Sequence, residues 1–420
     1  MAIKAPEAQI LKKTAGKNIP HLLPALAALA LVIALLAGGI FYARSVEQAS
    51  VNDLAPARIS LTNLGSTLQE AALRQSDLLP VYGSSEMYEE MDENSASQFF
   101  RTYPTGFTVF EVALSGITSI EIAQSLAALG PELKGKKVVI SFTPSMFDSL
   151  AVGPTAYAGD FSRLHANEMI FSPILSLSLK QRAASRMLDY PDTLAEDPVL
   201  AFALQNLASH TPIDTLLYYL SLPIGRLQTE VIRLQDYWAV MSWINLNPQD
   251  VLPVERQTYP IDWNAEIVRA RNLQRQLTSS NSYGIENSLL NLKKYQRILK
   301  TKVAPGSDDE FFIQKLSNST EWEDLDILLS VLKETGAQPL ILSRPLNGAM
   351  WNRMGVSASA RQLFYDKLQK TVQPYGFSLI DFSDQDTNRL FSIDLSSHTS
   401  RLGWIYVDQA LDAFYHGTIH

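Results

Sequence analysis

The hydrophobic pattern of the chain begins with one long segment that has no charged side chain, residues 22–43. About 20 apolar residues are enough for a helix to cross the ~30 Å hydrocarbon core of a bilayer. Lysines precede this segment, and Glu47 and Asp53 follow it. By the positive-inside rule, the pattern predicts a single membrane anchor with residues 1–21 as a cytoplasmic tail and the remainder of the chain outside.

Two other interpretations of this segment are weaker. The apolar region of a cleavable signal peptide usually has about 7–15 residues and ends at a small-x-small site. Residues 43–45 leave only a weak site of this kind, and the bulky residues 40–42 precede it. A buried core helix is the third alternative, but helices of globular proteins seldom lack charge over six turns. The pattern therefore favours an anchor that stays attached.

Beyond the anchor, the apolar pattern changes twice. Leucines near a period of three to four positions predict a helical stalk over residues 44–77. After it, short apolar runs alternate with helix-like sequence, as is typical of parallel strands that are covered by helices on both faces. The predicted strands lie at 78–82, 107–114, 138–142, 339–343 and 377–382. The fold class we expect is α/β, a doubly wound, mostly parallel sheet in a three-layer sandwich.

The segment at about 155–300 has a helical texture instead. The clearest helices are predicted at 197–208 and at 214–245, the second interrupted at Pro223-Ile224-Gly225. A further helix at 322–335 leads into the fourth strand and ends before Gly336. We therefore expect one extracytoplasmic domain over residues 78–420, with a helical insertion between its third and fourth strands.

Composition narrows the chemistry of this domain. The 420 residues include no cysteine, which excludes disulfides, cysteine-bound metals and thiol nucleophiles, and only six histidines. The formal net charge of −8 divides into +4 for the first 44 residues and −12 for the rest, which argues against a nucleic-acid binder. Outside the C-terminal tail, which holds His416 and His420, no histidine pair has helical metal-ligand spacing, and no glycine-rich phosphate-binding motif occurs. We expect neither a metal site nor a cofactor.

One candidate for the chemistry follows the first predicted strand, where Gly83-Ser84-Ser85-Glu86 begins a helix. Ligands of open α/β sheets bind at the carboxyl ends of strands, and backbone N–H groups at a helix start can stabilise a developing oxyanion. A serine at such a position is, however, more often a simple helix cap. The segment gains catalytic meaning only if a base lies elsewhere in the chain.

Near the C-terminus, Asp394 and His398 supply such a base. An acid shortly before a histidine on a loop can hold one ring nitrogen and leave the other free to accept a proton. The other histidines lie at the membrane edge, in the helical insertion without an adjacent acid, or in the C-terminal tail. The alternative for His398 is an ordinary surface histidine beside a C-terminal helix, and the serine segment favours the catalytic interpretation.

These segments together resemble the DltD family, membrane-anchored proteins of D-alanyl-lipoteichoic acid biosynthesis that are related to SGNH hydrolases. The resemblance covers about residues 30–415 and rests mainly on Tyr-Gly-Ser-Ser-Glu at 82–86 and on His-x4-Gly-Trp at 398–404 with Asp408 beyond it. Further matching segments are Gly135-Lys136-Lys137 with Pro144 and Phe147, Tyr283-Gly284-Ile285, and Pro345-Leu346-Asn347-Gly348 with Trp351.

The resemblance implies roles for individual residues. Ser85 would be the nucleophile and His398 its base, with Ser84 in the place of the aspartate of the SGNH Gly-Asp-Ser motif. Gly116 would lie near the oxyanion through its N–H, and Asn347 would belong to the same oxyanion or substrate-binding group.

One position departs from the family. The family pattern is Asp-x-x-His, but here Leu395 occupies the acid's position and Asp394 lies four residues before His398. A one-residue bulge would bring Asp394 to the imidazole. Without that contact the histidine would lack its orienting acid, which in a triad enzyme costs about 10⁴-fold in turnover.

The function that this resemblance implies is acyl transfer outside the membrane, in which Ser85 carries D-alanine as an ester to a teichoic-acid-type polymer. The implied partners are a DltB-like membrane-bound O-acyltransferase, an acyl-carrier protein acting indirectly, and the anionic polymer as acceptor. Because the exported part is acidic, capture of a polyanion by charge alone is disfavoured. Two alternatives stay open: acetyl transfer to an exported polysaccharide, and a non-catalytic scaffold for the acyltransferase.

Overall fold

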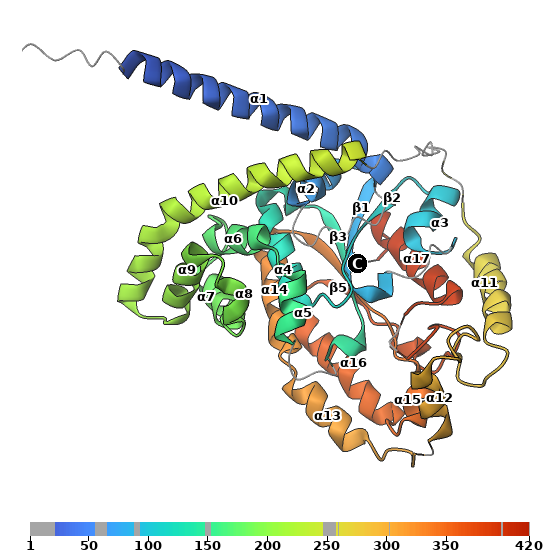
Figure 1. The fold of residues 1–420 in the computed structure, drawn as a ribbon. Coiled ribbons are helices and arrows are strands. Elements are labelled where there is room, and N and C mark those ends of the chain that lie inside the picture. The colour runs from blue at the N-terminus through green and yellow to red at the C-terminus, as the bar shows by residue number, and fades with distance from the viewer. Residues whose placement is uncertain are drawn as a thin grey trace, which may run out of the picture.

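A single parallel sheet forms the centre of the molecule (Figure 1). The computed structural model describes residues 22–54, 65–87, 93–147, 153–246, 258, 260–301, 303–395 and 398–419. The strand order is β2-β1-β3-β4-β5, and every pairing is parallel. The strands are β1 (Leu78–Gly83), β2 (Thr108–Ala113), β3 (Lys137–Phe142), β4 (Gln338–Ser343) and β5 (Ser378–Ile380). All five predicted strands and the α/β fold class are confirmed.

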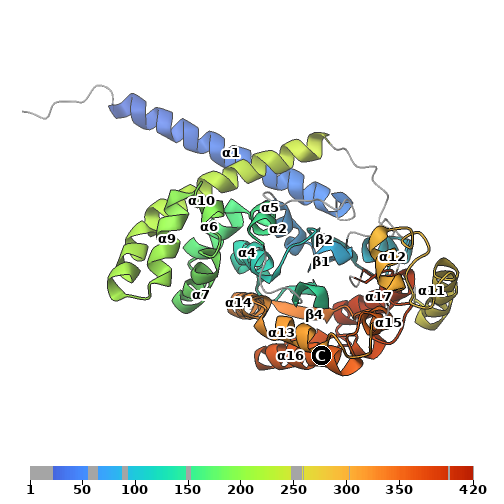
Figure 2. The same cartoon turned by 60° about the horizontal axis from the view of Figure 1, so that its bottom comes forward.

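Alternate residues of the strands enter two separate hydrophobic cores, because successive side chains point to opposite faces of a sheet. Tyr82, Ile140 and Phe142 belong to one core, and Val81 and Val139 belong to the other. Helices that contribute to the first core include α4 (Ser119–Leu129), α14 (Glu321–Thr335) and α16 (Ala358–Val372). Those of the second are α3 (Ala96–Thr102), α11 (Trp263–Leu277) and α17 (Arg401–Tyr415). Figure 2 shows the resulting layers, with helices on both sides of the sheet.

Between β3 and β4 the described chain is helical. The elements are α5 (Pro154–Asp160), α6 (Arg163–Phe171), α7 (Leu177–Met187), α8 (Pro191–Leu194), α9 (Pro198–Ala208), α10 (Pro212–Leu246), α11, α12 (Lys293–Lys300), α13 (Asp309–Asn318) and α14. Side chains of α6, α7, α9 and α10 share a hydrophobic core of their own. The predicted helix before β4 is confirmed, since α14 ends where Gly336 takes a left-handed conformation at φ +72°.

The predicted interruption at residues 223–225 is wrong, because α10 continues through Pro223 for 35 residues. A proline inside a helix costs about 3 kcal/mol, since it removes one hydrogen bond and crowds the preceding turn. Packing on α6 offsets that cost. The Tyr218 hydroxyl donates to the Ile170 carbonyl at 2.8 Å, and Gly225 lies so near Phe171 that an added Cβ would come within 2.2 Å of the ring.

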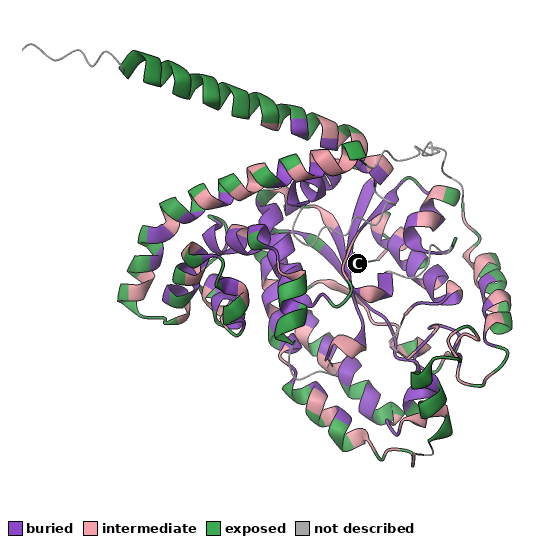
Figure 3. Cartoon of the chain, in the orientation of Figure 1, coloured by how far each residue is buried: buried purple, intermediate pink, exposed green. Residues whose placement is uncertain are grey.

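The N-terminal helix α1 (Leu22–Leu54) is long and apolar enough to cross a membrane as a single-pass anchor. Its first part is exposed along its length, as Figure 3 shows, whereas Val51 and Leu54 pack on the domain. The predicted cytoplasmic tail, residues 1–21, lies outside the described residues.

Within the segment predicted as a stalk, α2 (Ser66–Arg74) packs closely against the domain. Its apolar side chains share a core with Leu78 and Phe110 of the sheet. The carboxylate of Asp236 on α10 accepts hydrogen bonds from the N–H groups of Gly65 and Thr67. These contacts attach the start of α2 to the helical region between β3 and β4.

Candidate active site

The turn after β1 presents two serines at the carboxyl end of the sheet. Gly83 is the last residue of β1, and η1 (Ser85–Met87) follows at once. A Cβ at Gly83 would lie 2.6 Å from Glu86 Oε1 and 2.7 Å from Met87 Cγ. Real Cβ atoms do not approach so closely, so the fold of this turn requires glycine for space. The tight turn leaves Ser84 buried and Ser85 half-buried.

His398 lies between Ser85 and Asp394. Its Nε2 is 3.1 Å from Ser85 Oγ, and its Nδ1 is 2.9 Å from Asp394 Oδ2. The other carboxylate oxygen, Asp394 Oδ1, accepts the backbone N–H of His398 at 3.3 Å. The structure thus brings together the three residues that were singled out as nucleophile, base and orienting acid.

A short hairpin explains why the unusual spacing of Asp394 and His398 still permits this contact. Ser392 and Thr399 form an antiparallel bridge, and the N–H of Ile393 donates to the carbonyl of His398 at 3.0 Å. The bridge and this hydrogen bond hold residues 392–394 and 398–399 side by side in the hairpin. Asp394 and His398 consequently meet across it, although they are four positions apart in the sequence.

The electrostatic surroundings of His398 favour its protonated form. Burial alone lowers the pKa of the imidazole, and the charge of Lys294 acts in the same direction. The hydrogen bond and the charge of Asp394, together with the charge of Glu86, outweigh both, so the pKa of His398 is raised above its ordinary value. Such a site stabilises the imidazolium that forms when a histidine takes a proton from a neighbouring hydroxyl.

Two buried residues below the serines were not identified as site residues from the sequence. Glu86 accepts the N–H of Ser84 at 3.0 Å, and burial raises its pKa although this hydrogen bond and the charge of Arg344 oppose the shift. Arg344 donates from Nε to Ser141 Oγ at 3.3 Å, and its guanidinium lies 4.7 Å from the ring centre of Trp404. The sequence signals that could have identified these two residues are the position of Arg344 directly after the fourth predicted strand and the position of Glu86 in the serine motif.

Gly116 and Ser84 lie next to each other at the sheet edge. The N–H of Gly116 donates to Ser84 Oγ at 3.1 Å. Gly116 has φ +93°, a conformation that favours glycine, and it is exposed. Its N–H thus lies beside the turn that carries Ser85. The N–H of Ser85 itself is at the first position of η1, where helical N–H groups have no partner within the helix.

Asn347 lies behind the hairpin that carries Asp394. Its amide nitrogen donates to the carbonyls of Tyr283 at 3.1 Å and Asp394 at 3.4 Å. Its side-chain oxygen accepts the N–H of Met350 and caps α15 (Gly348–Arg353). The amide that was expected near the oxyanion or substrate therefore holds backbone carbonyls, including that of the acid.

The Tyr283-Gly284-Ile285 segment supports the same hairpin. Gly284 has φ +78°, and a Cβ added there would lie 1.7 Å from the carbonyl oxygen of Arg389. Glu286 donates its N–H to the carbonyl of Ile393 at 3.0 Å. The backbone contact at Gly284 and this hydrogen bond explain how a distant segment helps to position Asp394.

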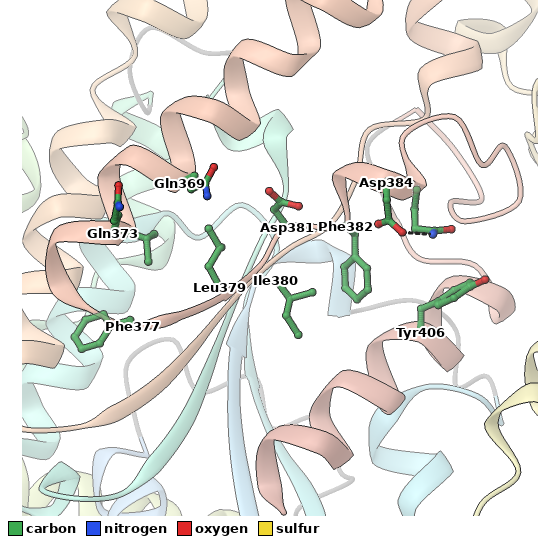
Figure 4. A pocket seen from close by; sticks show the side chains of 11 residues that line it. Gln369, Gln373, Phe377, Leu379, Ile380, Asp381, Phe382, Asp384 and Tyr406 are labelled. Atoms are coloured by element: carbon green, nitrogen blue, oxygen red, sulfur yellow. Dashed lines mark hydrogen bonds between the residues drawn. The ribbon is translucent and has the colours of Figure 1, made fainter. Parts of the chain in front are cut away.

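A separate hollow of about 560 Å³ lies beside the edge strand β5 (Figure 4). Leu379, Asp381 and Tyr406 are among its lining residues, which include no serine and no histidine. It therefore does not offer the serine–histidine pair that the turn after β1 and the C-terminal hairpin supply. Within the described parts of the chain, no three histidine, aspartate or glutamate side chains are grouped to hold a metal ion.

Comparison with known proteins assigns the chain to a family. Curated relatives, each named Protein DltD, are 26% identical in Bacillus subtilis over 84% of this chain and 86% of the relative, and 25% identical in Staphylococcus aureus over 90% and 92%. A third, from Lacticaseibacillus rhamnosus, is 24% identical over 96% and 93%. The profile of the family described as DltD protein matches residues 59–416. The chain therefore belongs to the DltD family.

Proposed function

We propose that the chain is a membrane-anchored acyl-transfer protein that moves D-alanine, as an ester, onto a teichoic-acid-type polymer. The observation that carries the proposal is the continuous contact from Asp394 through His398 to the Ser85 hydroxyl, with distances of 2.9 and 3.1 Å. Membership of the DltD family supplies the pathway, D-alanylation of teichoic acid.

In the proposed first step, His398 Nε2 takes the proton of the Ser85 hydroxyl as the oxygen attacks the carbonyl carbon of the donor. Asp394 holds the proton on Nδ1, so that Nε2 is the acceptor. When the donor's leaving group departs with the proton from His398, the acyl group remains on Ser85 as an ester. The N–H groups of Ser85 and Gly116 are the proposed donors to the oxyanion, the latter after Ser84 Oγ rotates away.

The second step is the same chemistry in reverse order. His398 takes a proton from a hydroxyl of the polymer, and that oxygen attacks the ester carbonyl. The bond to Ser85 Oγ breaks, and Ser85 recovers its proton from His398. The reaction exchanges one acyl–oxygen bond for another without a change of oxidation state, so this step needs no oxidant or reductant.

The anchor places this chemistry beside a membrane. By the charge pattern around residues 22–43, we propose that the domain is extracellular and the N-terminus is cytoplasmic. The proposed donor-side partner is a DltB-like membrane-bound O-acyltransferase, which an acyl-carrier protein would supply indirectly. Delivery by a membrane partner also fits a domain whose acidic charge disfavours unaided capture of an anionic polymer.

Complementation of a strain that lacks its native copy tests the proposal. We expect the wild-type chain to restore polymer-bound D-alanine and Ser85→Ala to leave it at the background level. Ser185→Ala is the matched control, because Ser185 is exposed on α7, where its hydroxyl bonds only the helix backbone at Gln181. Restoration of D-alanine by Ser85→Ala at the wild-type level would show that the proposal is wrong.

The two alternatives are separated by labelling. Mass spectrometry of the acylated Ser85 peptide distinguishes a D-alanyl from an acetyl group by the added mass. A serine-directed fluorophosphonate should label the wild-type chain and spare Ser85→Ala. Absence of labelling in both chains would favour the non-catalytic scaffold.

A further inference from the structure

A carboxylate that the proposed reaction does not use lies beside the candidate oxyanion glycine. Asp160 is the last residue of α5, and its Oδ2 is 3.6 Å from the point that a Cβ on Gly116 would occupy. The same glycine donates its N–H to Ser84 Oγ, next to Ser85. Gly116 therefore contacts the nucleophile turn through its N–H, and the carboxylate of Asp160 lies beside the face of Gly116 where a side chain would be.

Asp160 has no charge partner among the residues that the structure describes. Among the residues that the structure describes, no cationic side chain and no hydrogen-bond donor contacts its carboxylate. The side chain is half-buried. A carboxylate removed from water usually has a compensating partner, because desolvation of the charge is costly. An unpaired one at the edge of a reaction site suggests that the partner arrives with a ligand.

The cavity next to Asp160 is small. Leu114, Ile117 and Ser162 line it with Asp160, and the enclosed space is about 20 Å³, enough for one water-sized group. Gln124 and His165 also line it, and their buried atoms Gln124 Oε1 and His165 Nε2 have no hydrogen-bond partner among the described residues. A methyl group fits this space, whereas a long acyl chain does not.

We propose that Asp160 binds the α-ammonium group of the aminoacyl substrate while its carbonyl carbon is at Ser85. The inference rests on the proposed function, whose cargo is D-alanine, and it specifies how that cargo is distinguished from an uncharged acyl group of the same size. The ammonium would form a charge-assisted hydrogen bond with the carboxylate. The methyl group would occupy the small cavity that Leu114 and Ile117 help to line. Asp160 is in this view a specificity residue.

The neighbouring carboxyl group, Glu121, is a poorer candidate. It already accepts the N–H and the hydroxyl of Thr118 as the capping box of α4. Burial raises the pKa of Glu121 to about 8, so it is mostly uncharged at neutral pH. Burial raises the pKa of Asp160 only to about 6, so its carboxylate is mostly ionised there. Asp160 is therefore the carboxylate that carries charge when the reaction runs.

A pair of esters that differ only in the amino group tests the inference. The full-length chain in detergent is assayed with the p-nitrophenyl esters of D-alanine and of propionic acid. We expect Asp160→Asn to lower kcat/KM for the D-alanyl ester by about 10- to 100-fold, the usual effect of losing a hydrogen bond to a charged group. The value for the propionyl ester should stay within about twofold of wild type.

Asp192→Asn is the matched control, since Asp192 is an exposed carboxylate on α8. It should leave both esters unchanged. Equal losses for the two esters in Asp160→Asn would indicate a general structural effect and overturn the inference. An unchanged preference for the D-alanyl ester would overturn it as well.

A binding measurement distinguishes failure of this inference from failure of the proposed function. If wild-type protein turns over neither ester, the proposed function fails, and calorimetry on Ser85→Ala with D-alaninamide and propionamide decides the inference. D-alaninamide should bind more tightly, and Asp160→Asn should remove that difference. If the two amides bind equally to a chain that retains Asp160, the inference is wrong.

Discussion

The imidazole Nε2 of His398 lies 3.1 Å from the hydroxyl of Ser85, although the two residues are 313 positions apart in the sequence. Ser85 follows the first strand of the sheet, and His398 lies on the hairpin just before α17. Parallel strands end at one edge of the sheet, so residues that follow different strands can converge there. The contact therefore depends on the whole fold and not on any local segment.

Because Ser85 and His398 act on the same proton, their substitutions should not be additive. We expect His398→Gln and Ser85→Ala each to lower kcat by about 10⁴-fold or more, and the double variant to lose little beyond either single one. Steady-state kinetics of the four chains with one activated ester measures this. His416→Gln is the control, because His416 is exposed in the last turn at the C-terminus. Multiplicative losses would contradict a shared role.

Asp394→Asn tests the orientation of the imidazole. An asparagine keeps the shape of the side chain but can donate to Nδ1, which favours the tautomer with the proton on Nε2. A similar replacement in a serine protease triad costs about 10⁴-fold in turnover, and we expect a loss of that order. Asp384→Asn is the control, since Asp384 is exposed beside β5. Turnover within about tenfold of wild type would contradict an orienting role for Asp394.

Much of the fold was predictable because it depends on short-range patterns. Five apolar runs gave the five strands, and Gly336 marked the end of α14. The continuity of α10 was not predictable, because the cost of Pro223 is offset by tertiary packing on Phe171 and Ile170. Local propensity has no information about that packing.

The principal residues of the candidate site were predictable from the sequence. The contacts that position and charge those residues were not. Ser85 and His398 were identified by residue type and context. The Asp394 contact was uncertain, because a hairpin and not the spacing determines it. Glu86 is recognisable in the sequence only as part of the serine motif, and its influence on His398 comes from its charge, at a proximity that the fold creates and the spacing does not reveal.

The raised pKa of His398 predicts how activity depends on pH. Only the neutral imidazole accepts a proton, so kcat/KM should fall as the pH decreases through a midpoint above about 6.5, the ordinary histidine value. The groups that act on the imidazole are Asp394, Glu86 and Lys294. Glu86→Gln removes a carboxylate whose charge raises the pKa of His398, so it should move the midpoint to lower pH.

A pH–rate profile from pH 5 to 9 measures the midpoint in both chains. Glu310→Gln is the control, because Glu310 is an exposed carboxylate on α13. Its profile should coincide with that of wild type. A midpoint that rises in Glu86→Gln would have the wrong sign and would contradict the electrostatic role of Glu86.

The raised pKa of His398 also increases the free energy of unfolding at acid pH. A group whose pKa is higher in the folded state binds a proton more tightly there, so the Asp394–His398 contact stabilises the fold most below the unfolded pKa of histidine. This contribution is lost as the pH rises through the folded pKa. His398→Gln should therefore lower the Tm more at pH 5 than at pH 9.

Gly284→Ala should disturb the hairpin that carries Asp394. The added Cβ would lie 1.7 Å from the carbonyl oxygen of Arg389, at a φ of +78° that already costs alanine about 1–2 kcal/mol. Relief of the overlap requires the backbone to move, so we expect a total destabilisation of about 3 kcal/mol or more. Gly376→Ala is a matched control, because Gly376 has φ +70° and an added Cβ there meets nothing within 4 Å. Thermal unfolding should show a small decrease in Tm for Gly376→Ala and a larger one for Gly284→Ala.

Only Gly284→Ala should also lower kcat, since Tyr283 and Glu286 connect this segment to Asn347 and Ile393. Equal effects of the two substitutions on Tm and kcat would show that the contact between Gly284 and Arg389 does not position the hairpin.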